Sequence, residues 1–172
     1  MNDTTHPKET QADDSLSAYL HSHLMAASAG ERLFEEAAKS WVGSDLGAEL
    51  SRLAAEVRDD KAALQDICEQ MHADMPDHKK PLAWIGSHLA GMDPLNPTHS
   101  ADGAAGQLEL EALIAAVSGK LLLWKTLFVL SGAYEGIDVG RIQRLLDRAV
   151  EQIRVLEPLL LDTSTLRLTP NK

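Results

Sequence analysis

Cysteine and aromatic residues are scarce in this chain of 172 residues, and each shortage excludes a class of protein. The single cysteine, Cys68, excludes an internal disulfide and any cysteine-rich metal site, and its neighbours place it on the apolar side of a helix. Aromatic residues make up 4% of the chain and β-branched residues are few, whereas alanine and leucine are abundant. This composition favours helices over strands.

Basic charge is also in short supply. The chain has 16 Lys and Arg against 26 Asp and Glu, which gives a formal net charge of −10. A surface that binds nucleic acid displaces phosphate counterions with clustered Lys and Arg, and the sequence contains no such cluster. Anionic membrane surfaces are disfavoured for the same reason, so we expect neither nucleic acid nor a membrane as a partner.

An uninterrupted apolar run is missing as well. Residues 1–13 lack the apolar stretch of a secretion signal. The most apolar segment, 112–130, is long enough to cross a bilayer, but it carries Lys120 and Lys125 within its span. We therefore expect a cytoplasmic protein.

What the chain does contain is four long segments with helical periodicity. Their expected ranges are 15–41, 46–73, 108–131 and 138–161, with Asp13 and Asp138 among the candidate N-caps. The first two and the last two helices are joined by tight turns. A long connection over about 74–107, with a short extra helix over 81–91, links the two hairpins.

Two helical hairpins joined by a long connection predict an all-α fold, a ferritin-like four-helix bundle. The bundle domain is expected over residues 15–162. Residues 1–14 and 163–172 are rich in Thr, Asp, Pro and Asn and are expected to be disordered tails.

Helical periodicity places a few polar residues among the inward-facing apolar ones. They are His23, Asp60 with Glu56 on the border of its stripe, Lys120 and Glu109. The fourth helix is expected to contribute no polar group to the core. Because a lone buried charge is too costly to persist, we expect a buried polar network in which Lys120 pairs with Asp60 and shares Glu56.

The ligand set of a di-iron bundle is incomplete. Such bundles take a Glu from two helices and a Glu-x-x-His from each of the other two. The chain has one such motif, Glu69-Gln70-Met71-His72, and its outer residues turn away from the apolar stripe. Lys120 would also neutralise the carboxylates that a divalent ion needs. We therefore expect no cofactor and no catalytic residues; a metal site built from His23, Glu56, Asp60 and Glu109 is the alternative.

Several short blocks resemble a family of uncharacterised bacterial proteins with a ferritin-like fold. The blocks are Tyr19-Leu20-x-x-His23-Leu24 with Ala29-Gly30, Leu53-Ala54-Ala55-Glu56 with Asp60-Lys61 and Leu64, Ala83-Trp84, and Glu109-Leu110-Glu111-Ala112-Leu113 leading to Gly119-Lys120 and Leu123-Trp124. They cover residues 16–128. The resemblance implies the bundle fold and places the five inward polar residues at motif positions, but it implies no activity.

The function expected from these observations is that of a non-enzymatic helical bundle that acts through protein contacts, as a homodimer. The support is the lack of a catalytic constellation and a third helix that is apolar around most of its circumference. The first alternative is a divergent metal-binding or oxidoreductase bundle that uses His23 and the carboxylates. The second is a small-ligand binder with a pocket lined by Phe34, Lys120 and Trp124.

Overall fold

The computed structural model describes residues 11–73 and 103–169, and the secondary structure of these residues is four helices without a strand. The helices are α1 (Asp14–Ser40), α2 (Asp45–Gln70), α4 (Gly103–Leu130) and α5 (Val139–Leu168). This confirms the all-α class and the four-helix bundle. The expected short helix over 81–91 lies outside the described residues.

Side-chain caps explain where three of the helices begin. The Asp13 carboxylate accepts from the backbone N–H of Leu16, the Ser44 hydroxyl accepts from Gly47, and the Asp138 carboxylate accepts from Arg141. Each cap satisfies one of the N–H groups that a helix start leaves without an intrahelical partner. Asp13 and Asp138 are two of the caps that the sequence predicts.

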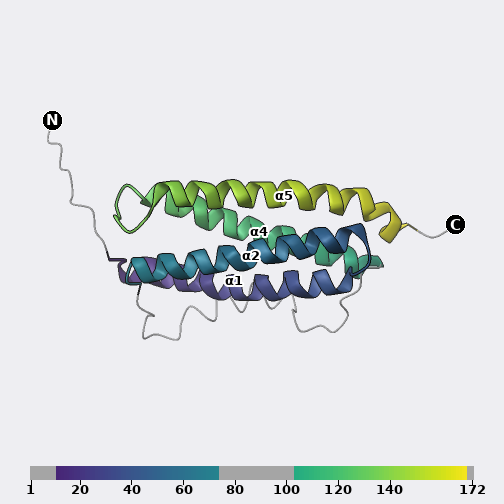
Figure 1. Cartoon of the computed structure of the whole chain (residues 1–172), viewed down its shortest axis with the longest axis horizontal. Helices are drawn as coiled ribbons and strands as arrows, with labels where there is room; N and C mark the ends of the chain where they lie inside the picture. Colours follow the sequence, from purple (N-terminus) through teal and green to yellow (C-terminus); the bar gives the residue numbers. More distant parts are fainter. Residues whose placement is uncertain (1–10, 74–102, 170–172) are drawn as a thin grey trace.

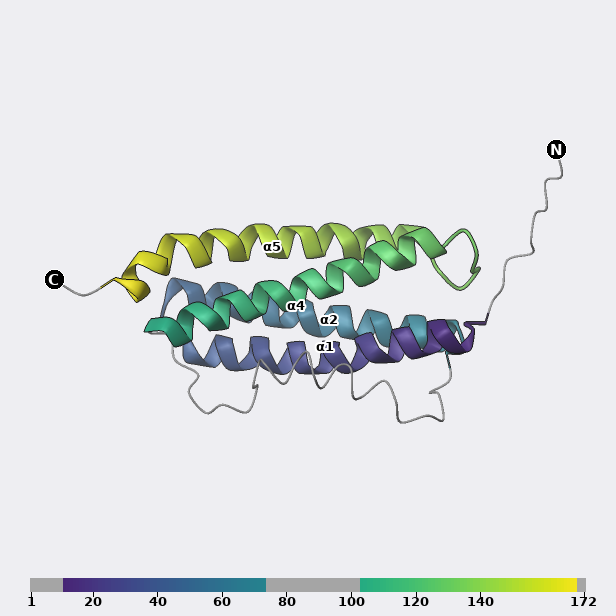
Figure 2. The same cartoon turned by 180° about the vertical axis from the view of Figure 1, so that it is seen from behind.

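The four helices form an elongated bundle of two hairpins (Figure 1). A turn over residues 41–44 joins α1 to α2, and residues 131–138 join α4 to α5. In the turn, Gly43 has a φ of +86°, a conformation that glycine adopts without a steric penalty. The hairpins pack face to face, with α1 against α4 and α2 against α5, so that α1 and α5 run in one direction and α2 and α4 in the other (Figure 2).

One apolar core runs through the bundle. The predicted stripes supply its largest members from α1, α2 and α5, among them Leu20, Phe34, Leu53, Leu64, Ile67, Met71, Ile142, Leu145 and Leu156. From α4 come Leu110, Leu113, Val117, Leu123, Trp124 and Leu127. Burial of these side chains is the main favourable term of folding.

Helix α5 is longer than expected and corrects the predicted tail over 163–172. The helix continues to Leu168, and hydroxyl side chains along its last turns bond back to carbonyls one turn earlier, as Thr163 does to Leu159. Arg167 anchors this end, since its guanidinium donates to the Gln107 side chain on α4. At the other terminus, Ala12 is buried and its N–H donates to the Met71 carbonyl, so ordered chain begins before the predicted residue 15.

Helix α4 is unusual among the four in its apolar character. In the part of the chain that the structure describes, it is the one helix long and apolar enough to cross a membrane by length and composition alone. Its most apolar 18-residue window has a mean hydropathy of 1.8, and only 28% of that window is buried inside the bundle. Leu108, Leu122 and Val129 are exposed on its outer side, so both faces of α4 carry apolar side chains.

Candidate functional site

A single buried carboxylate lies at the middle of the bundle. Asp60 belongs to the inward stripe of α2 and is 1% exposed. Two cations from the other hairpin reach its two oxygens. Lys120 Nζ on α4 donates to Oδ2, and Arg148 Nη2 on α5 donates to Oδ1. The predicted ion pair between Lys120 and Asp60 is therefore present, with a second cation that the sequence analysis did not assign.

Gln152 on α5 completes the network. Its side chain is 1% exposed. Its Oε1 accepts from Lys120 Nζ at 2.6 Å, and its Nε2 donates to Glu56 Oε2 at 3.0 Å and to Asp60 Oδ2 at 3.4 Å. Glu56 in turn pairs with Arg52 at the edge of α2. We call Glu56, Asp60, Lys120, Arg148 and Gln152 the Asp60 network.

The network corrects the expectation that the fourth helix gives no polar group to the core. Gln152 follows Leu145 and Ala149 and precedes Leu156 at the three- and four-residue steps of one helical stripe. Arg148 lies beside that stripe and is partly exposed, and its guanidinium reaches inward to Asp60. The spacing of Gln152 was the signal available in the sequence.

The charges of the network balance. Asp60 contacts the two cations Lys120 and Arg148, and Glu56 pairs with Arg52 and accepts a hydrogen bond from Gln152. Burial lowers the pKa of Lys120, because removing the ammonium from water disfavours its charged form; Asp60 opposes this shift and Arg148 adds to it. Since both oxygens of Asp60 are engaged by cations of the chain itself, the arrangement binds three helices together rather than presenting a free carboxylate to a substrate.

Two residues predicted for the network lie elsewhere. Glu109 is buried at the far end of the bundle, where its Oε2 accepts a hydrogen bond from Trp41 Nε1 at 3.1 Å. It precedes Lys120 by three turns, about 16 Å along α4, so it cannot share the same carboxylate cluster. His23 is half-buried and packs edge-on against Tyr19, with ring centroids 4.6 Å apart. Glu109 therefore lies at another height than Asp60, and the ring contact of His23 is with Tyr19 of its own helix.

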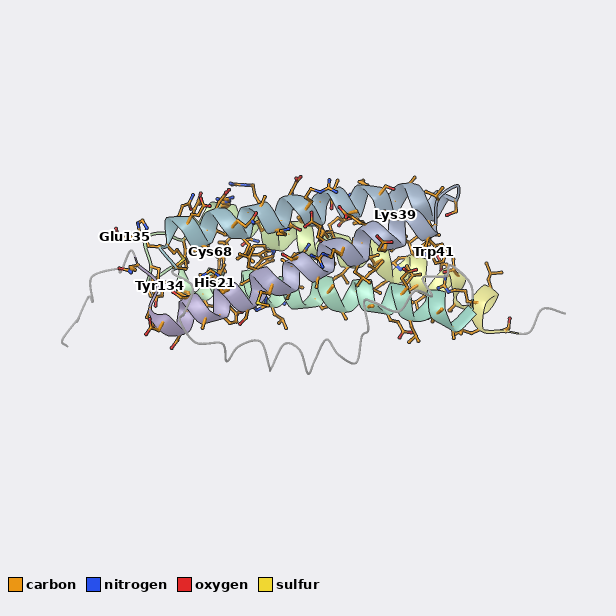
Figure 3. All side chains as sticks on the ribbon, turned by 90° about the horizontal axis from the view of Figure 1, so that it is seen from below. His21, Lys39, Trp41, Cys68, Tyr134 and Glu135 are labelled. Carbon is orange, nitrogen blue, oxygen red and sulfur yellow. The ribbon has the colours of Figure 1, made fainter. Side chains whose placement is uncertain are left out.

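A second polar cluster closes the end of the bundle where α1 and α5 finish and α4 begins. Figure 3 shows Trp41 at this end, opposite the end that carries Tyr134. The Arg167 guanidinium lies 5.5 Å from the centre of the Trp41 ring and donates to Gln107 Oε1 at 2.9 Å. This cation–π contact and hydrogen bond tie α5 to α1 and α4.

The remaining candidates occupy ordinary core positions. Within the described residues, no three His, Cys, Asp or Glu side chains are grouped in a way that would hold a metal ion, so the four alternative metal ligands are not brought together. Phe34 and Trp124, proposed as the lining of a ligand pocket, are each 1% exposed within the apolar core. Cys68 is buried, and burial raises the pKa of its thiol.

Comparison of the chain with protein-family models, with curated proteins and with solved structures finds no match. The resemblance to a ferritin-like family consequently remains a prediction, and the site has to be interpreted from its own geometry.

We predict that Asp60→Asn destabilises the protein by about 3–5 kcal/mol, because it leaves the largely buried Lys120 and the partly buried Arg148 without their counter-charge. The matched control is Asp59→Asn, an exposed neighbour on the same helix, which should change the free energy of unfolding by less than about 0.5 kcal/mol. Urea denaturation followed by circular dichroism measures both. Equal effects of the two substitutions would contradict a structural role of the Asp60 network.

A second prediction concerns pH. Burial lowers the pKa of His23 from its ordinary value of 6.5, so the folded protein prefers the neutral ring. The unfolded chain takes up the proton at that ordinary value, and the contribution of His23 to stability is therefore complete above it and is lost as the pH falls toward the folded pKa. His23→Gln should make the loss of stability between about pH 7.5 and about pH 5.5 smaller.

The control for this prediction is His72→Gln, at an exposed position after the last residue of α2. Urea midpoints at the two pH values give the comparison. A wild-type pH dependence that His23→Gln leaves unchanged would show that the imidazole is not the group responsible.

Proposed function

We propose that this chain is a non-enzymatic helical bundle that acts through protein contacts, as a homodimer. The observation that carries the proposal is the exposure of large apolar side chains on α4. Leu108 is 63% exposed, Leu122 is 61% exposed and Val129 is 79% exposed, all on the most apolar helix of the bundle. An apolar stripe of this kind costs free energy in water unless a partner covers it.

The inner polar residues support the same proposal. The Asp60 network satisfies its charges internally, as described above, and it offers neither a nucleophile with an adjacent base nor a carboxylate free to act as one. Its chemistry is that of a structural ion network, so we place the functional surface on the outside of the bundle.

The ferritin-like identity is part of the proposal at the level of topology. Helix α2 ends beside the start of α1, where His21 Nε2 lies 2.9 Å from the Ala73 carbonyl, and α4 begins beside the end of α1. The connection over 74–102 therefore joins opposite ends of the bundle, as one long crossover does in ferritin-like folds. A cytoplasmic location is part of the same proposal, and the acidic composition supports the lack of nucleic-acid or membrane partners.

A metal-binding or oxidoreductase function is the alternative. It requires Asp60 to exchange Lys120 or Arg148 for a metal ion, and it requires His23 and Glu109 to move along the bundle toward Asp60. The hydrogen bond of Glu109 with Trp41 holds Glu109 away from such a site, and the His23 ring packs against Tyr19 of its own helix.

We predict that the full chain sediments with twice the mass of one chain, because a dimer removes the exposed side of α4 from water. Sedimentation velocity over a wide concentration range, at physiological salt and without an affinity tag, makes the measurement. A sample that stays monomeric at the highest concentration would contradict the proposed function.

A further inference from the structure

The outer face of α4 carries a regular seven-residue repeat. Starting at Ala104, exposed or half-exposed residues recur at alternating steps of four and three residues along nearly the whole helix. They are Ala104, Leu108, Glu111, Ala115, Ser118, Leu122, Lys125 and Val129. We call this set the α4 seam. Steps of four and three are the spacing with which two helices wind around each other as a coiled coil.

The seam is nearly symmetric about its centre. Glu111 lies seven residues before Ser118, and Lys125 lies seven residues after it. When two copies of α4 are placed antiparallel with the two-fold axis at Ser118, Glu111 of each copy faces Lys125 of the other. The same axis places Leu122, four residues after Ser118, close to the small side chain of Ala115, which lies three residues before Ser118.

We propose that the α4 seam is the dimer interface of this protein, formed antiparallel by two copies of the chain about a two-fold axis at Ser118. This inference rests on the proposed function and specifies its partner and geometry. The proposal rests on the self-complementary charges. A two-fold interface brings the same surface of both copies together. A helix that bears one acid and one base at equal distances from the axis therefore pairs each charge with its opposite on the other copy.

The two charges have no strong partner within the described part of the chain. Lys125 is exposed and forms no ion pair there, and Glu111 accepts one long hydrogen bond, at 3.4 Å, from Gln107. The two residues are about 21 Å apart along α4 and cannot reach each other within one copy. Pairing between copies satisfies both, and it does so twice per dimer.

A lipid surface fits the seam less well than a second copy does. Insertion of this face into a bilayer would bury the Glu111 carboxylate and the Lys125 ammonium among Leu108, Leu122 and Val129 without a counter-charge, which is costly. A narrow stripe of five apolar side chains with two charged residues along it is the pattern of a helix–helix contact.

The experiment is sedimentation equilibrium of the full chain carrying charge reversals at the seam. Glu111→Lys sets lysine against Lys125 of the partner at two symmetric places, and Lys125→Glu does the same with two acids. Each single variant should weaken the dimer about tenfold. The double variant restores the two opposite-charge pairs and the wild-type net charge, and it should recover the wild-type dissociation constant to within about twofold.

A second pair of variants tests the apolar part of the seam. Leu122→Glu places a carboxylate in the apolar part of the seam and should abolish the dimer, while Leu161→Glu, at a leucine of α5 that is 66% exposed, should leave it intact. Because Leu122 is 61% exposed, the monomer should keep its helical circular dichroism and its urea midpoint.

Four results would overturn the α4 seam. If the wild-type chain is a dimer and neither single charge reversal changes its dissociation constant, the interface lies elsewhere and the proposed function stands. If the wild-type chain is a monomer, both the α4 seam and the proposed function are rejected. An unchanged mass with a lowered urea midpoint for Leu122→Glu would mean that another part of the same chain covers the face. If the wild-type protein pellets with phosphatidylserine vesicles and Leu122→Glu abolishes this, the outer face of α4 binds a membrane.

Discussion

Asp60 places a negative charge in the middle of the bundle, and side chains of α4 and α5 neutralise it. Apolar contacts alone tolerate sliding of one helix along another, because burial is roughly proportional to area and has no preferred direction. The Asp60 network removes that freedom. Three pairs set a single antiparallel register between α2 and α5: Glu56 with Gln152, Asp60 with Arg148 and, about two turns further, Asp66 with Arg141 at 2.7 Å. Lys120 brings α4 to the same height. Displacing either helix by one turn, about 5.4 Å, would leave buried charges without partners.

The inner and outer sides of α4 have different roles. Its inner side supplies Lys120 to the network and Trp124 to the core, whereas its outer side carries the apolar residues of the α4 seam. This explains why the helix is apolar around most of its circumference without being a core helix buried on every side. In our account the inner face holds the fold together, and the outer face carries the function as a contact between two copies.

Much of the fold could be predicted from the sequence, because helical periodicity and N-caps are local signals. The ion pair of Lys120 with Asp60 was also predictable, since both residues lie at mid-helix and remain at similar heights whichever way the helices run. Periodicity states which face a residue occupies but not its height or its neighbour, and for that reason His23 and Glu109 were assigned to a cluster that they do not join. Gln152 was not predicted, because its uncharged polar side chain does not by itself indicate a buried position; its helical spacing with Leu145, Ala149 and Leu156 does. The end of α5 was missed because Arg167 finds its partners on α4 and α1, which no local pattern records.

The central claim is that Lys120 and Arg148 neutralise Asp60 in the position where a metal ion would otherwise bind this carboxylate. A crystal of the full chain soaked in manganese, with anomalous diffraction recorded from it, tests this most directly. The account predicts Lys120 Nζ and Arg148 in contact with Asp60 and no anomalous peak at that carboxylate. A manganese peak bound to Asp60, with Lys120 displaced from it, would contradict the account and make the inner carboxylates a metal site.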